Sequence, residues 1–285
     1  MEFRERAPAK LNLYLHVVGR RDDGYHLLDS LVAFADIADE VTVAPATALS
    51  LRIAGPFAAA LMSGTGENLV HRAARLYAAR LRRQPRVALT LEKRLPVASG
   101  IGGGSSDAAA TLRALQSLWR AELAEDARAD LALALGADVP ACLVPRAAFV
   151  GGIGERIEPA PPLPPLAVVL ANPGVAVATA DVYARRAGAF SEPARFVDMP
   201  GDAAGLAALL AERRNDLADA ARELAPAIAD VIAALAATPG ALLARMSGSG
   251  ATCFALYAAS HEAEAAAQTL AAASPRWWVK AGNLL

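Results

Sequence analysis

A run of glycines and serines at residues 100–106 has the composition of a phosphate-binding loop. The run reads Gly-Ile-Gly-Gly-Gly-Ser-Ser and precedes an alanine-rich segment, 108–119, that favours a helix. Glycines lack Cβ atoms, so their backbone N–H groups can converge on phosphate oxygens, and a helix N-terminus adds unpaired N–H groups and a positive dipole end. A flexible hinge with a serine cap would use the same residues. Three consecutive glycines ahead of a helix favour phosphate binding, with Ser105 and Ser106 as added hydroxyl donors.

Two well-known nucleotide loops do not match this segment. A Walker loop ends in Gly-Lys followed by Ser or Thr, and residues 95–107 contain no lysine. A dinucleotide-binding fingerprint needs a glycine where Ser105 stands, and residues 95–99 separate the loop from the preceding strand. The sequence therefore predicts a phosphate loop of a third architecture.

The elements that must position the loop follow from hydrophobic periodicity. In the first half of the chain, strands are expected over residues 10–18, 27–34, 40–44, 49–53 and 87–92. Helices are expected there over 68–81, 108–119 and 124–135, the last ending at Gly136 as a left-handed C-cap.

A proline-rich linker, residues 159–165, separates these elements from a second set. In that second set, strands are expected at 166–171, 242–246, 253–257 and 276–281. Helices are expected between them at 180–187, 203–237 and 261–273. This order predicts two α+β domains, residues 1–158 and 159–285.

Composition restricts the class of protein. The 285 residues are 55% hydrophobic with a net charge of −1, which argues against binding nucleic acid or an anionic membrane surface. The N-terminus lacks a signal-peptide core, and the longest uncharged stretch, 159–180, is interrupted by prolines. Cys142 and Cys253 are far apart and lack zinc-ligand spacing, which predicts two buried thiols in a reducing compartment. We therefore expect a cytoplasmic protein without a resident metal cluster.

Three segments together resemble the GHMP kinase superfamily, which includes galactokinase, homoserine kinase and mevalonate kinase. They are residues 7–13, the loop at 96–106 and a second Gly/Ser loop at 246–251. Further stretches at 24–26, 102–107 and 136–140 are similar to a member that phosphorylates a hydroxyl of a cytidine-diphosphate-linked sugar alcohol in the non-mevalonate route to isoprenoids. The resemblance implies an N-terminal domain like ribosomal protein S5 domain 2 and a ferredoxin-like C-terminal domain.

The resemblance implies ATP as co-substrate, held by the loop and two residues outside it. The implied contacts are Asn68, Lys93, Pro96, Val97, Ala98, Ser99, Gly100, Ile101, Gly102, Gly103, Gly104, Ser105 and Ser106. Asn68 and Lys93 could equally be surface residues, and Ala98-Ser99 stands where the family's loop usually has more glycine. Mg²⁺ is expected because the phosphates need charge neutralisation, although no carboxylate cage is visible and Asp107 is only a candidate ligand.

The resemblance also places Lys10 and Asp138 at the reacting hydroxyl. Asp138 would accept the hydroxyl proton, and the Lys10 ammonium would lower the pKa of the hydroxyl and keep the aspartate ionised. Without the resemblance, Asp138 is interpreted as an N-cap or turn aspartate and Lys10 as a solvated strand end.

The second substrate would be bound by residues from both domains. The resemblance makes Tyr25 and Tyr183 aromatic plates for the cytosine, with His26 at its polar edge. Asn12 lies one pleat from Lys10 on the same strand face, and Ser247 and Gly248 would close the site. An exposed Tyr-His pair and a core tyrosine at 183 are the alternatives. The other histidines lack metal spacing and are predicted to be structural or exposed: His16, His71 and His261.

Two other functions compete with this hypothesis. A different small-molecule kinase, acting on homoserine or mevalonate, would share the glycine loop, but residues 24–26 and 136–140 argue against it. A ligand-binding sensor would share the fold, but it would not need both Lys10 and Asp138. The sequence predicts small-molecule substrates and leaves the oligomeric state open.

Overall fold

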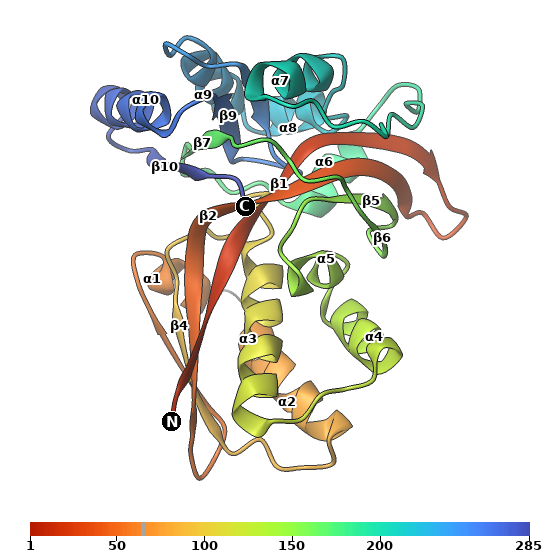
Figure 1. Ribbon diagram of the computed structural model, residues 1–285, viewed down its shortest axis with the longest axis vertical. Helices are drawn as coiled ribbons and strands as arrows, with labels where there is room; N and C mark the ends of the chain where they lie inside the picture. The colour runs from red at the N-terminus through yellow and green to blue at the C-terminus, as the bar shows by residue number, and fades with distance from the viewer. Residues whose placement is uncertain (64–65) are drawn as a thin grey trace. The chain divides into compact units, whose positions relative to one another are not determined.

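The structure is a computed structural model that describes residues 1–63 and 66–285 (Figure 1). These residues form two compact units. The first unit contains residues 1–9, 38–97 and 102–145, and the second contains residues 10–37, 98–101 and 146–285. Since these units are not sequential halves, the division into domains at residue 158 stays a prediction.

Two long strands contribute residues to both units. They are β1 (Phe3–Arg20) and β2 (His26–Pro45). β2 is one strand where the sequence predicts two, over residues 27–34 and 40–44. The glycine loop is also divided, with residues 98–101 in the second unit and the residues from 102 onward in the first.

The first unit combines a small sheet with helices. β2 pairs antiparallel with β4 (Val87–Glu92), which pairs parallel with β3 (Ser50–Ala54). Alternate residues of β4 are fully buried, as its predicted alternation requires. The helices of this unit are α1 (Ala58–Met62), α2 (Leu69–Arg80), α3 (Gly103–Trp119), α4 (Glu125–Leu135) and α5 (Val139–Leu143).

The second unit contains an antiparallel sheet with strand order β10-β7-β9-β8. Its strands are β7 (Ala167–Asn172), β8 (Leu243–Met246), β9 (Cys253–Tyr257) and β10 (Trp278–Asn283). Helices α8 (Ala218–Leu224), α9 (Ala227–Ala236) and α10 (Ser260–Ala273) share one buried apolar core with this sheet (Figure 1). Strand order and connections are those of the expected ferredoxin-like arrangement.

The second unit contains further strands and helices outside this sheet. The first part of β2 pairs with β5 (Ala148–Gly152), which pairs with β6 (Arg156–Pro159). Two further helices are α6 (Thr179–Arg185) and α7 (Ala203–Ala211). No helix in the described ranges is long and apolar enough to cross a membrane.

Two predictions about helix ends are wrong. Gly136 follows α4 with φ 162°, which is extended backbone, so the predicted left-handed C-cap is absent at this residue. α3 begins at Gly103 rather than at Ala108, so Gly103 and Gly104 belong to the first turn of the helix instead of a loop before it. Glycine has a low helix propensity, so the sequence predicts a later start of the helix. In the structure, tertiary contacts rather than helix propensity hold this turn.

Candidate active site

One face of β1 carries a row of polar side chains, because successive side chains of a strand point to opposite faces. The row consists of Lys10, Asn12, Tyr14 and His16, and none of the four exposes more than 7% of its surface. A buried polar group is costly unless it is hydrogen-bonded. The surroundings of β1 must therefore supply partners along this face.

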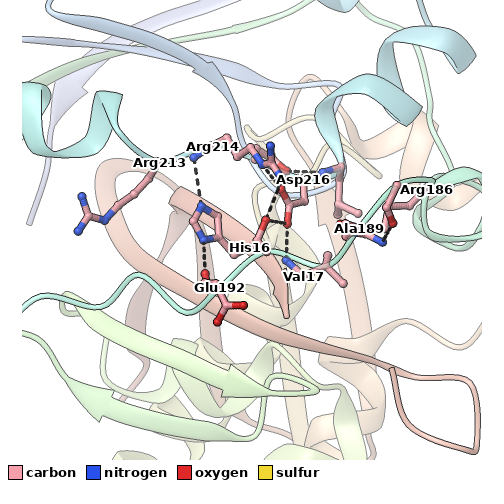
Figure 2. Close-up of polar contacts among 12 residues, drawn as sticks. His16, Val17, Arg186, Ala189, Glu192, Arg213, Arg214 and Asp216 are labelled. Carbon is pink, nitrogen blue, oxygen red and sulfur yellow. Dashed lines mark hydrogen bonds and ion pairs between the residues drawn. The ribbon is translucent and has the colours of Figure 1, made fainter. Parts of the chain in front are cut away.

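Figure 2 shows how the far end of the row is fixed. The Nδ1 atom of His16 lies 3.0 Å from the Glu192 carbonyl oxygen, and the Arg214 backbone N–H donates to Nε2 over 3.3 Å. Because Nε2 accepts here, Nδ1 carries the proton. Asp216 accepts a hydrogen bond from the backbone N–H of Val17 over 2.7 Å. These contacts confirm a structural role for His16.

The near end of the row joins three of the sequence motifs. The Lys10 backbone N–H donates to the Ile101 carbonyl over 2.9 Å. The Asn12 backbone N–H donates to the Ser247 hydroxyl over 3.1 Å, and that hydroxyl donates to the Gly100 carbonyl over 3.0 Å. The structure thus brings β1, the first half of the glycine loop and the second Gly/Ser loop together within the second unit.

Close backbone approach explains two of the glycines in this region. Gly100 has φ +74°, and a Cβ atom there would lie 2.5 Å from the Ser247 carbonyl oxygen. Gly248 has φ +53°, and its Cβ would lie 2.6 Å from the Gly100 carbonyl oxygen. Neither position admits a side chain, because backbone atoms cannot yield as the end of a flexible side chain can.

The remaining residues at the start of the loop are also held. Pro96 is buried, Val97 is half-buried, and the buried Ser99 accepts a hydrogen bond at its carbonyl from the Thr252 N–H over 3.0 Å. Ala98 is exposed and has φ +50°, a conformation that glycine adopts more readily than alanine. The departure noted at Ala98-Ser99 thus falls on a residue whose backbone favours glycine.

Ser247 and Asn215 both make hydrogen bonds that hold the second Gly/Ser loop in place. Ser247 is fully buried, and its hydroxyl bonds to Gly100 and Asn12 link backbone segments, so its contact with substrate stays a prediction. The Asn215 amide donates to the carbonyls of Met246, over 2.9 Å, and Gly248, over 2.8 Å. Sequence reasoning missed Asn215, because an asparagine among charged residues carries no motif.

The first turn of α3 lies in the first unit. Gly102 precedes it with φ +61°, and the Ser106 N–H makes the first helical bond to the Gly102 carbonyl. The N–H groups of residues 103–105 therefore have no partner within the helix, as an anion site requires. The Ser106 hydroxyl donates to the Pro8 carbonyl over 2.7 Å, whereas Ser105 is partly exposed.

A buried ion cluster lies beneath this turn. The Nζ atom of Lys93 is 2.5 Å from Asp39 Oδ2 and 2.7 Å from Asp107 Oδ2, and Lys93 exposes 2% of its surface. A Cβ atom at Gly103 would lie 3.1 Å from that Nζ. The alternative of a surface lysine at 93 is therefore wrong. Asp39 also accepts a hydrogen bond from the Leu95 N–H over 2.8 Å, which fixes the chain leading into the loop.

Asn68 and Asp138 both precede helices but use their side chains differently. Asn68 caps α2 by accepting a hydrogen bond from the Val70 N–H over 2.8 Å. Asp138 stands at the N-cap position of α5, yet its side chain makes no capping bond, so capping does not explain this carboxylate. Asp138 belongs to the first unit and Lys10 to the second, and their pairing stays a prediction.

Comparison with known proteins identifies the family. Residues 68–146 match the GHMP kinases N terminal domain and residues 194–276 match the GHMP kinases C terminal domain. The 4-diphosphocytidyl-2-C-methyl-D-erythritol kinase of Paramagnetospirillum magneticum is 51% identical over 99% of each chain, and that of Cereibacter sphaeroides is 55% identical over 98% of each chain. The chain belongs to the 4-diphosphocytidyl-2-C-methyl-D-erythritol kinase family.

Solved structures agree with this assignment and confirm the two-domain α+β GHMP kinase fold. A crystal structure of 4-(cytidine 5'-diphospho)-2C-methyl-D-erythritol kinase is 39% identical, covers 99% of each chain and has a TM-score of 0.78. Homoserine kinase from Cytophaga hutchinsonii covers 99% of this chain with a TM-score of 0.72 but is only 18% identical, which shows a shared fold alone.

The residues expected to bind cytidine in this kinase family gather in the second unit. The rings of His26 and Tyr183 stack with centroids 5.1 Å apart and planes at 27°. Tyr25, beside the Gly24 turn, is 61% exposed, which confirms that its ring projects from the fold. Tyr183 also packs against the apolar core, so part of its ring serves that core. Burial lowers the pKa of His26, and Arg20 and Arg186 lower it further.

Among the described residues, no group of three or more His, Cys, Asp or Glu could hold a metal ion. Asp107 does not fit as a Mg²⁺ ligand, because its carboxylate is buried against the Lys93 ammonium. Its other oxygen, Oδ1, has no hydrogen-bond partner within the described ranges. Cys142 and Cys253 are both buried thiols that are not joined in a disulfide, as predicted.

Proposed function

We propose that this kinase transfers the γ-phosphoryl group of ATP to the 2-hydroxyl of 4-diphosphocytidyl-2-C-methyl-D-erythritol, in the non-mevalonate route to isoprenoid precursors. The observation that carries the proposal is 51–55% identity, over almost the whole length, to kinases named for this alcohol. Structures of homoserine kinase and mevalonate kinase are 12–18% identical to this chain, so their likeness shows the fold alone and does not support their alcohols as substrates.

The reaction is an in-line exchange of one P–O bond for another. The substrate hydroxyl oxygen bonds to the γ-phosphorus, the bond from that phosphorus to the β,γ-bridging oxygen breaks, and ADP leaves with the electron pair. Asp138 accepts the hydroxyl proton, while the Lys10 ammonium favours formation of the alkoxide. The burial of Lys10, which exposes 5% of its surface, supports a place in the site rather than at a solvated strand end.

ATP binds with its phosphates at the first turn of α3. The N–H groups of residues 103–105 are available there, and the partly exposed Ser105 adds a hydroxyl. The Lys93 ammonium is buried between two carboxylates, so it does not contact the nucleotide directly. Lys93 instead supports the first turn of α3, which binds the phosphates. The cytosine lies at Tyr25, His26 and Tyr183, and Asn12 contacts the alcohol.

The metal ion, the class of partner and the cellular compartment are proposed from general chemistry and composition. Mg²⁺ arrives as the counter-ion of the ATP phosphates, since Mg²⁺ usually keeps waters and substrate phosphates as ligands. The substrates are small molecules, and a net charge of −1 disfavours nucleic acid or a membrane surface as a partner. Two buried cysteines that keep their thiols suit the cytoplasm.

The test is an assay of the purified chain with ATP, Mg²⁺ and a panel of alcohols. ADP release is measured with 4-diphosphocytidyl-2-C-methyl-D-erythritol, homoserine and mevalonate, and ³¹P NMR then places the new phosphate. Turnover is expected with the first alcohol only. Turnover with another alcohol, or with none, would contradict the proposal.

A further inference from the structure

Ser30 of β2 is a buried hydroxyl that the proposed reaction does not use. It exposes 1% of its surface and makes two hydrogen bonds to β1. Its Oγ donates to the Tyr14 carbonyl over 2.5 Å, and the Asn12 amide nitrogen lies 2.8 Å from the same Oγ. β1 and β2 are already paired through their backbones. The two hydrogen bonds of Ser30 are therefore not needed to join these strands.

The hydrogen count at Ser30 determines which way the Asn12 amide faces. A serine hydroxyl has one proton, and a carbonyl oxygen can only accept. The proton of Ser30 therefore goes to the Tyr14 carbonyl, and Oγ must accept from Asn12. Only the NH₂ group of the amide can donate, so that group faces Ser30 and Oδ1 of Asn12 faces away.

The direction in which Oδ1 faces is occupied by the second Gly/Ser loop. A Cβ atom at Gly248 would lie 3.4 Å from Oδ1, so the glycine leaves this oxygen uncrowded. The Asn12 backbone is also fixed, by its hydrogen bond to Ser247. Asn12 is thus held at both its main chain and its amide, one pleat from Lys10 on the same face of β1.

We propose that Ser30 is a positioning residue, which orients the Asn12 amide so that Oδ1 accepts a hydrogen bond from a hydroxyl of the sugar-alcohol substrate. A polyol offers hydroxyl protons, and an amide turned the other way would present a donor in place of this acceptor. The proposal rests on the proposed function and names the group of the alcohol that Asn12 recognises.

The test removes the Ser30 hydroxyl in two backgrounds. In the wild-type background, Ser30→Ala is expected to raise the Kd and KM of the cytidine-diphosphate-linked alcohol about tenfold, the scale of one hydrogen bond. The Kd of ATP should stay within about twofold. In an Asn12→Ala background, the same change should have no further effect on the alcohol, because Ser30 acts through the amide that is gone.

Three further measurements keep a structural role distinguishable. Cytidine diphosphate lacks the polyol, so Ser30→Ala should leave its Kd unchanged. Ser30→Thr retains the hydroxyl and should restore the alcohol Kd. Thr238→Val is the matched control, since this buried hydroxyl of the same unit also donates to a carbonyl, that of Leu235, over 2.6 Å. It should lower Tm and leave the alcohol Kd unchanged.

Two outcomes would overturn the proposal. One is an effect of Ser30→Ala that persists in the Asn12→Ala background or extends equally to ATP and cytidine diphosphate. The other is an unchanged alcohol Kd in a folded Ser30→Ala chain that still phosphorylates the alcohol, and this result leaves the proposed function intact. A wild-type chain that neither binds nor phosphorylates the alcohol would overturn both.

Discussion

The two ends of the glycine loop are held by opposite kinds of contact. Residues 98–101 pack through neutral groups, namely the Ser247 hydroxyl, backbone hydrogen bonds and glycines that touch backbone atoms. The turn at 103–107 rests on charges, with Lys93 between Asp39 and Asp107. Backbone packing tolerates no added atom, whereas a lysine side chain can shift its ammonium. The Asp107 carboxyl beside that ammonium responds to pH. Mutations at the two ends should therefore fail in different ways.

The largest expected effect concerns a residue that lies at neither end. Asp138→Asn should reduce kcat by about 10²–10⁴, the usual contribution of a general base. Asparagine has almost the same size and shape as aspartate, so the fold and the Kd of both ligands should be retained. Steady-state kinetics and calorimetric titration check this. Turnover close to wild type would remove Asp138 from the mechanism.

The next prediction compares the loss of stability caused by alanine at each end of the loop. Gly100→Ala should reduce the free energy of unfolding by about 2–5 kcal/mol, because a Cβ at φ +74° meets backbone atoms at 2.5–2.7 Å. Gly103→Ala should change it by less than about 1 kcal/mol, because a better helix former offsets a small shift of Lys93. Urea unfolding measures both, and equal losses would show that the ends are not held differently.

A smaller effect comes from the charges under α3. Burial raises the pKa of Asp107 to about 7, although Lys93 opposes this. The folded chain then binds a proton more tightly than the unfolded chain, so stability from this group is lost as pH rises toward and through the folded pKa. Between about pH 5 and 8, the wild-type Tm should fall more than that of Asp107→Asn. Parallel pH profiles would exclude this role for Asp107.

The smallest effect is a gain at the neutral end. Ala98 has φ +50°, where a side chain costs about 1–2 kcal/mol. Ala98→Gly relieves that cost but increases the entropy of the unfolded chain, so a net stabilisation of about 1 kcal/mol is expected. Thermal unfolding measures it, with ATP affinity as a check on the loop. A lower Tm would mean that the left-handed conformation is not strained here.

Sequence reasoning predicted the elements whose pattern is local. The alternation over residues 87–92 predicted β4 with its bounds, and the periodicity over 68–81 predicted α2 with one residue too many at each end. It failed where tertiary contacts decide. The first turn of α3 forms from glycines because Ser106 and the residues around Lys93 hold it. The short elements β5, β6 and α5 lack a distinct period and were missed.

The same distinction applies to the site. The glycines could be proposed as phosphate-binding residues from their type and spacing, and Lys10 could be proposed as a catalytic residue from the resemblance. Ser30, Asp39 and Asn215 could not, because each is an ordinary polar residue until the fold gives it a partner. Lys93 was found by resemblance, but its burial between two carboxylates became apparent only in the structure.

The central claim is that ATP phosphates bind at the first turn of α3 and the cytidine of the alcohol at Tyr25. Calorimetric titration of both ligands into Gly104→Asp and Tyr25→Ala tests it most directly. Gly104 is exposed, and a Cβ there meets only Leu69 Cδ1 at 3.5 Å, so an aspartate fits and suits a helix N-terminus. Its charge should nevertheless weaken ATP about 10- to 100-fold and leave the alcohol unchanged. Tyr25→Ala should weaken the alcohol about 5- to 150-fold and leave ATP unchanged. Equal losses of both ligands in either variant, or no loss in both, would contradict the account.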